Sequence, residues 1–137
     1  MATGERAIRL LLVEDNPGDV RLTEDTLEQS AVPVEMEVAH DGAEALGYLR
    51  QRSPFHAGGP PDMILLDLNL PRLDGRKVLA EVRSDPELNR IPVVILTSSP
   101  GDEDVLMAFS FHADGYVRKP LELKEFNDLV RRLEVVA

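Results

Sequence analysis

Hydrophobic and polar positions along this chain form blocks that predict strands and helices in turn. Continuous apolar runs such as Met63–Leu66 have the length of central strands covered on both faces. Val34–Ala39 instead alternates apolar and acidic residues, which is typical of a strand near a sheet edge. The five predicted strands are Arg9–Val13, Val34–Ala39, Met63–Leu66, Val93–Leu96 and Tyr116–Val117.

Five helices are predicted in the remaining segments, because apolar residues recur there at helical spacing. The first runs from Pro17 to about Ser30, the third ends near Ser84, and the Pro/Gly-rich segment Ser53–Pro61 is a loop outside the core. The apolar stripes are Val20, Leu27 and Ala31; Ala45, Leu46 and Leu49; Val78, Leu79 and Val82; Val105, Leu106 and Phe109; and Leu123, Phe126, Val130 and Leu133.

This alternation predicts an α/β fold in which helices cover both faces of a parallel sheet. For 137 residues, the expected fold is a flavodoxin-like doubly wound sheet of five parallel strands in the order 2-1-3-4-5, with five helices. We expect a single domain over residues 1–137, with a core from about 7 to 134 and no effector domain after the last helix.

Composition narrows the environment and the partners. The chain has no cysteine, no apolar run long enough to span a bilayer and no signal-peptide pattern, so we expect a cytoplasmic protein without a membrane partner. Twenty-five acidic against fifteen basic residues give a net charge of −10, which would repel phosphate backbones and anionic lipids. Nucleic-acid binding is therefore not expected.

Polar residues follow the predicted strands at their carboxyl ends, where open α/β sheets place their sites. These residues are Glu14 and Asp15, Asp67 and Asn69, Thr97 and Ser98, and Lys119. In the order 2-1-3-4-5 the first and third strands are neighbours, so three carboxylates would share one pocket. Each pair at about 4 Å repels by roughly 4 kcal/mol at an effective dielectric near 20, which favours an added cation. All-oxygen ligands indicate Mg²⁺.

Four sequence blocks, LLVEDNPGD, ILLDLNLPRLDG, VVILTSS and GYVRKP, resemble in order and spacing the motif blocks of response-regulator receivers. The resemblance covers nearly the whole chain. The wording VEDNPGDVRLT, the loop SPFHAGGPP and the segment ILLDLNLPRLDGRKVLAEVRSDP are most similar to the small stand-alone receivers that partner bacterial phytochrome kinases.

The resemblance implies a role for each residue at the predicted cation site. Asp67 is the expected phospho-acceptor, Asp15 a direct Mg²⁺ ligand and Glu14 a ligand through water, while Asn69 would offer its backbone carbonyl. The alternative for Glu14 and Asp15 is a pair of carboxylates at a helix N-terminus, and for Asn69 a turn residue.

The remaining site residues would bind the phosphoryl group. Lys119 is expected to reach a phosphoryl oxygen, and the Lys119–Pro120 peptide to be cis. Thr97 and Ser98 would hydrogen-bond the phosphoryl oxygens, while Tyr116 turns inward as the Thr97 hydroxyl moves. The alternatives are a solvated lysine, a strand-end cap and an ordinary half-buried aromatic.

The implied function is that of a response regulator in a two-component phosphorelay. It would take a phosphoryl group from a sensor histidine kinase, and the narrower resemblance implies that this kinase is a bacterial phytochrome. It would be no enzyme beyond promoting its own phosphorylation and slow autodephosphorylation. A receiver-like adaptor that acts without phosphorylation is the alternative. An aspartyl-phosphate hydrolase is disfavoured, because the position of its second acid holds Asn69.

Apolar residues beyond the core stripes predict a homodimer through the fourth helix, the fifth strand and the fifth helix. Met107 and Phe111 fall partly outside the fourth stripe, Leu129 adds to the fifth, and the chain ends in Val135-Val136-Ala137. An exposed apolar patch beside the switch residues would be a two-fold interface.

Overall fold

The protein folds around a five-stranded parallel sheet. The structure is a computed structural model that describes residues 7–51, 59–68, 70, 75–97 and 113–133. The strands are β1 (Ile8–Val13), β2 (Val34–Ala39), β3 (Met63–Asp67), β4 (Val93–Thr97) and β5 (Gly115–Arg118). Their order is β2-β1-β3-β4-β5, and every neighbouring pair is parallel, which confirms the predicted topology.

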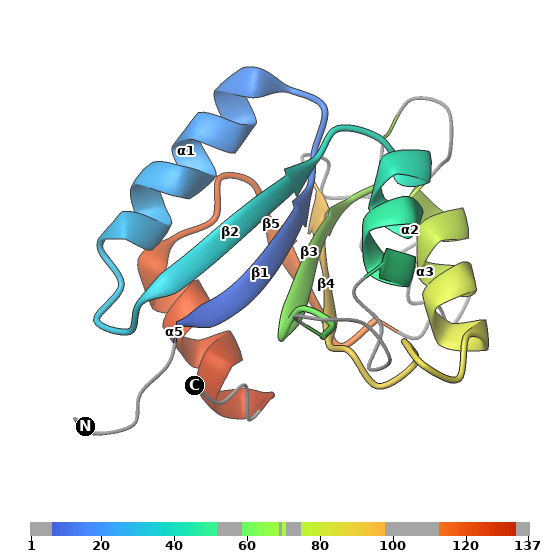
Figure 1. The fold of residues 1–137 in the computed structure, drawn as a ribbon. Coiled ribbons are helices and arrows are strands. Elements are labelled where there is room, and N and C mark those ends of the chain that lie inside the picture. The colour runs from blue at the N-terminus through green and yellow to red at the C-terminus, as the bar shows by residue number, and fades with distance from the viewer. Residues whose placement is uncertain (1–6, 52–58, 69, 71–74, 98–112, 134–137) are drawn as a thin grey trace.

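Helices cover both faces of the sheet. In Figure 1, α1 and α5 lie on one face, and α2 and α3 lie on the other. Their bounds are α1 Pro17–Glu28, α2 Gly42–Gln51, α3 Gly75–Ser84 and α5 Leu123–Arg132. The described residues thus contain four helices rather than the five expected, and the helix predicted around Val105, Leu106 and Phe109 falls within 98–112, outside them. In the described part of the chain, no helix combines the length and apolar character needed to cross a membrane.

Element boundaries differ from the predicted ones by one or two residues. α1 ends at Glu28 rather than near Ser30, and β3 and β4 each extend by one residue to include Asp67 and Thr97. The two polar residues are buried and continue the ladder, so their side chains begin inside the sheet edge. Apolarity alone ends each strand too early, because the pattern contains no signal for a buried polar strand residue.

Position in the sheet explains the strand sequences. Every residue of β3 and β4 is buried, as expected for central strands covered on both faces. Val34, Met36 and Val38 of β2 are half-buried, while Glu35 and Glu37 are exposed. This alternation confirms that β2 is an edge strand.

Two hydrophobic cores lie on opposite faces of the sheet, because successive strand residues point to opposite sides. Leu11 and Val13 of β1 belong to the core beneath α2 and α3, whereas Leu10 and Leu12 belong to the core beneath α1 and α5. Phe126 of α5 is fully buried in the second core.

Leu129 is buried in that second core as well, at 5% exposure, so its assignment to an exposed dimer patch was wrong. The helix brings it onto the same face as Phe126, three residues earlier, which is the core-facing side. Val130 and Leu133 are partly buried against the same core. Met107, Phe111 and the terminal Val135-Val136-Ala137 lie outside the described residues.

The strand register places the carboxyl ends of β1, β3, β4 and β5 at the same edge of the sheet. Val13 pairs with Leu66, Asp67 with Leu96, and Thr97 with Arg118. The residues that follow these pairs therefore emerge at one edge of the sheet, where Glu14 comes next to Asp67.

Candidate functional site

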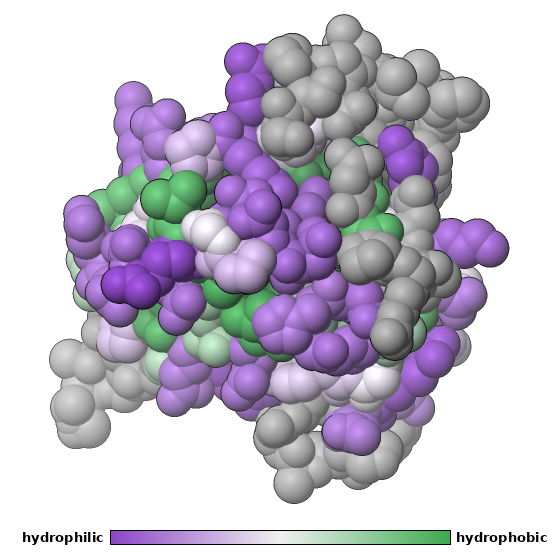
Figure 2. All heavy atoms as spheres, turned by 90° about the horizontal axis from the view of Figure 1, so that it is seen from above, coloured by the Kyte–Doolittle hydropathy of each residue, from purple (hydrophilic) through white to green (hydrophobic). Residues whose placement is uncertain are grey.

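The carboxyl edge of the sheet carries an acidic cluster, formed by Glu14, Asp15 and Asp67. One carboxylate oxygen from each lies within 4.8 Å of the others. Figure 2 views the molecule from this side, and most of the described residues on the face are hydrophilic. The structure therefore brings together the three carboxylates that the sequence predicts as neighbours.

Glu14 is a buried acid with an altered pKa. It is 1% exposed, and burial, reinforced by the neighbouring Asp67 carboxylate, raises its pKa to about 7 despite the opposing effect of Lys119. Asp67 is almost as buried, whereas Asp15 is exposed. The cluster thus has a dry side and a side open to solvent.

Lys119 provides the positive charge next to this cluster. Its Nζ lies 2.6 Å from Glu14 Oε1, 3.1 Å from Asp67 Oδ2 and 3.2 Å from Asp19 Oδ2. Burial lowers the pKa of Lys119, but its close ion pair with Glu14 and the negative charge of Asp67 outweigh the effect of burial and raise the pKa above its usual value. The lysine therefore stays charged, and it is no freely solvated surface residue.

The peptide after this lysine is cis, as the resemblance implies for Lys119–Pro120. The Lys119 backbone N–H donates to the Thr97 carbonyl over 2.8 Å, which continues the β4–β5 ladder past Arg118. This bond places the start of the Lys119 side chain beside the end of β4.

The start of α1 explains why the loop after β1 keeps its shape. Asn16 is the N-cap, and its side chain accepts a hydrogen bond of 3.0 Å from the Asp19 backbone N–H. The Asn16 N–H in turn donates to Glu14 Oε2 over 3.2 Å. Asp15 therefore does not cap the helix, while Glu14 both orders the loop and takes part in the cluster.

Gly75 touches the backbone that carries Asp67. A Cβ at this position would lie 2.5 Å from the Asp67 carbonyl oxygen and 2.9 Å from Leu68 Cα. The Gly75 N–H also donates to the Leu68 carbonyl over 3.2 Å. The lack of a side chain at Gly75 therefore lets α3 begin directly against the end of β3.

Thr97 and Tyr116 share one face of neighbouring strands. Ile95 pairs with Tyr116, and Thr97 lies two residues beyond Ile95 and so on the same side of β4. Thr97 is buried, while Tyr116 is half-buried against the core beneath α2 and α3. Burial raises the pKa of the Tyr116 hydroxyl. The predicted switch pair is thus on adjacent strands.

Two expected site residues, Asn69 and Ser98, lie outside the described residues. One residue that the sequence did not single out, Asp19, does reach the site through its contact with Lys119. Its position in the first turn of the helix that follows Asp15 was the available signal.

The residues fit a hard divalent cation. All three carboxylates offer oxygen, the ligand that Mg²⁺ prefers. Glu14 Oε1 is buried and, although it is near the ammonium, accepts no well-directed hydrogen bond. A buried oxygen without a directed donor leaves a coordination direction open.

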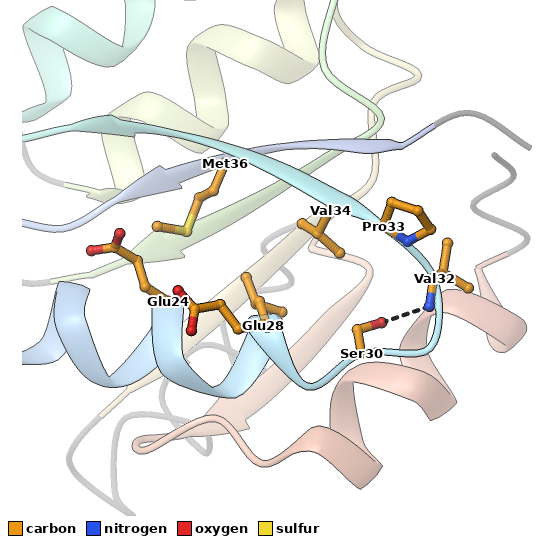
Figure 3. A pocket seen from close by; sticks show the side chains of 8 residues that line it. Glu24, Glu28, Ser30, Val32, Pro33, Val34 and Met36 are labelled. Carbon is orange, nitrogen blue, oxygen red and sulfur yellow. Dashed lines mark hydrogen bonds between the residues drawn. The ribbon is translucent and has the colours of Figure 1, made fainter.

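An open groove of about 390 Å³ lies elsewhere, between the end of α1 and the beginning of β2. Figure 3 shows Glu24 and Glu28 from α1 opposite Val34 and Met36 from β2, with the Val32 N–H donating to Ser30 Oγ. The groove lies at the amino end of β2, away from the acidic cluster. Its lining residues include two carboxylates but no lysine, so they do not repeat the combination found at the acidic cluster.

Known proteins resemble this chain along most of its length. The family model of the response regulator receiver domain matches residues 10–131 of this chain. Response regulator Rcp1 from Synechocystis sp. is 41% identical over 91% of this chain and 85% of that protein.

Solved structures agree with the sequence match. The bacteriophytochrome response regulator AtBRR is 40% identical, with a TM-score of 0.86 and 96% of both chains covered. The phosphorylated cyanobacterial phytochrome response regulator RcpA is 43% identical, with a TM-score of 0.73 over 94% of this chain and 92% of that one. The Mn²⁺-bound form of Rcp1 is 40% identical, with a TM-score of 0.71 over 92% and 91%. The chain therefore belongs to the response regulator receiver domain family.

Proposed function

We propose that Asp67 is the phospho-acceptor of this response regulator and that a divalent cation, Mg²⁺, binds beside it. The observation that supports this most is the geometry around Asp67, where Lys119 Nζ lies 3.1 Å from Oδ2 and two further carboxylates are adjacent. Phosphoryl transfer to a carboxylate requires three parts: a nucleophilic carboxylate, a fixed positive charge such as the lysine ammonium, and oxygen ligands for a metal ion.

In the proposed reaction, a carboxylate oxygen of Asp67 attacks the phosphorus of a phosphohistidine on a partner kinase. The O–P bond forms as the P–N bond breaks, and the imidazole leaves with the bonding electron pair. Lys119 neutralises charge on a phosphoryl oxygen. When bound, Mg²⁺ supplies further charge neutralisation. Asp15, Glu14 and Asp67 would hold it, together with the Asn69 carbonyl that the resemblance implies.

After transfer, Thr97 would donate its hydroxyl to a phosphoryl oxygen, together with Ser98, and Tyr116 would turn toward the space that Thr97 leaves. The shared strand face of Thr97 and Tyr116 supports this coupling. The added charge of about −1.5 to −2 then shifts a surface between two states.

The proposed donor is a sensor histidine kinase of the bacterial phytochrome type. The similarity to Rcp1, AtBRR and RcpA supports this choice. We further propose that residues 1–137 act as one domain in the cytoplasm, without a nucleic-acid or membrane partner. The chain is a phospho-acceptor that promotes its own phosphorylation and slow autodephosphorylation, with no other substrate.

Phosphotransfer from a panel of purified histidine kinases, one of them a phytochrome, tests this proposal. Label should move to the wild type fastest from the phytochrome and should not move to Asp67→Asn. If no kinase and no small phosphodonor labels the wild type, the alternative of a phosphorylation-independent adaptor is favoured.

A homodimer through the predicted fourth helix, β5 and α5 is a separate proposal. The burial of Leu129 removes one of its supports, because the described part of α5 presents no fully exposed large apolar side chain. Sedimentation velocity with and without phosphodonor decides it. A truncation ending at Leu133 should weaken the dimer, and equal monomeric behaviour of all samples would exclude it.

A further inference from the structure

We propose that Asp19 is a positioning residue that holds Lys119 in its resting place and so limits the rate at which Asp67 is phosphorylated. The proposal rests on the function proposed above. Its basis is the third carboxylate contact of the lysine, in which Asp19 Oδ2 lies 3.2 Å from Nζ. Asp19 comes from α1, whereas Glu14 follows β1 and Asp67 ends β3.

The backbone of Asp19 is held on both sides, so its carboxylate has a defined origin. Its N–H donates to the Asn16 side chain over 3.0 Å, and its carbonyl accepts from Thr23 Oγ1 over 2.9 Å. Thr23 is buried, which ties this turn of α1 to the protein interior. Motion of the α1 turn is therefore not needed for the contact with Lys119.

An ammonium group has three N–H donors, and in the resting site it faces three carboxylates: Glu14, Asp19 and Asp67. To bind a phosphoryl oxygen, Lys119 must give up at least part of one contact. Glu14 and Asp67 belong to the acidic cluster that would hold the cation, but Asp19 does not. Asp19 therefore contacts the lysine without belonging to the cation cluster, and it competes with the incoming phosphoryl group for the lysine.

Asp19 also adds negative charge near the cluster, and this has opposite effects on the two ligands. The charge attracts a divalent cation, but it repels an anionic phosphodonor and retains Lys119. Neutralising Asp19 should therefore weaken cation binding and, once cation is saturating, speed phosphorylation. A residue that only maintained the fold would, when replaced, impair both.

The test measures the Mg²⁺ dissociation constant and the phosphorylation rate with acetyl phosphate at saturating Mg²⁺, for Asp19→Asn and the wild type. We expect the dissociation constant to rise and the maximal rate to increase, each by about two- to fivefold, as for loss of a partly exposed ion pair. Asp19→Glu, which keeps the charge, should return both quantities toward the wild-type values.

The matched control is Asp25→Asn, on the same helix. It makes the same change in charge, but Asp25 is exposed and pairs with Arg21 at 3.4 Å. Both quantities should stay at wild-type values there. If the wild type is phosphorylated and the maximal rate of Asp19→Asn is equal to or below the wild-type rate, this inference alone is overturned. A wild type that takes up no phosphoryl group instead defeats the proposed function, and this inference with it.

Discussion

The ammonium of Lys119 lies 3.1 Å from the carboxylate of Asp67, although 52 residues separate them in the chain. The sheet makes this contact possible, because only β4 lies between β3 and β5 and the carboxyl ends of these two strands are at the same edge. The side chain of Lys119 extends across the end of β4 to reach the acid. Its long stem thus links the last strand to the proposed reaction centre.

Replacing Lys119 by Gln should reduce phosphorylation of Asp67 by acetyl phosphate. The variant loses the cation that neutralises a phosphoryl oxygen, an electrostatic contribution that typically changes rates by about 10²- to 10³-fold. Intact-mass spectrometry over time measures the rate. Lys124→Gln is the control, because Lys124 is an exposed lysine on α5. Equal rates in Lys119→Gln and the wild type would exclude a role for this ammonium.

Glu14 should make the metal-free protein less stable as the pH rises. Its pKa is about 7 in the folded protein against 4.5 for the ordinary side chain, so the folded state holds the proton more tightly. Between these pH values the folded state binds more protons than the unfolded state, and the free energy of unfolding falls. Relative to Glu14→Gln, the wild type should lose about 1–3 kcal/mol from pH 4.5 to 8. Urea unfolding at several pH values measures this, and parallel pH dependence of the two proteins would contradict it.

Magnesium affinity should increase as the pH rises through about 7, because the cation must displace the proton of Glu14. Calorimetric titration between pH 5.5 and 8.5, a window of about three units around that pKa, measures it. Asp15→Asn is the informative comparison. The substitution neutralises the exposed carboxylate that we propose as a ligand, so the affinity should be lower at every pH, with the dependence on pH retained. An affinity of the wild type that does not change with pH would show that Glu14 is not protonated near neutrality.

Gly75→Ala should destabilise the protein and disturb the position of Asp67 together. The new methyl group would lie 2.5 Å from the Asp67 carbonyl oxygen, so backbone must move. We expect a loss of about 1–3 kcal/mol in the free energy of unfolding, the usual range for overpacking, and slower phosphorylation. Gly47→Ala is the matched control, because nothing lies within 4 Å of its added methyl group. It should be neutral or stabilising by about 0.5–1 kcal/mol. If both variants unfold like the wild type, the contact at Gly75 is not restrictive.

Periodicity was enough to predict the strand order and the meeting of Glu14, Asp15 and Asp67, because parallel strands bring their carboxyl ends to one edge. It was not enough to find Asp19, whose contact depends on how the first turn of α1 is oriented toward β5. The steric role of Gly75 was equally hidden, since a close backbone approach has no periodic signal. Leu129 was misjudged because an apolar residue at the border of a helical stripe is compatible with either face.

Phosphorylation of Asp67 can be measured by intact-mass spectrometry after incubation of the protein with acetyl phosphate and Mg²⁺. We expect a single added phosphoryl group in the wild type. The group should not form when Mg²⁺ is chelated before the phosphodonor is added, and it should be absent from Asp67→Asn. Peptide mapping after borohydride reduction should place the modification at Asp67. An unmodified wild type, or label that persists in Asp67→Asn at the wild-type level, would contradict it.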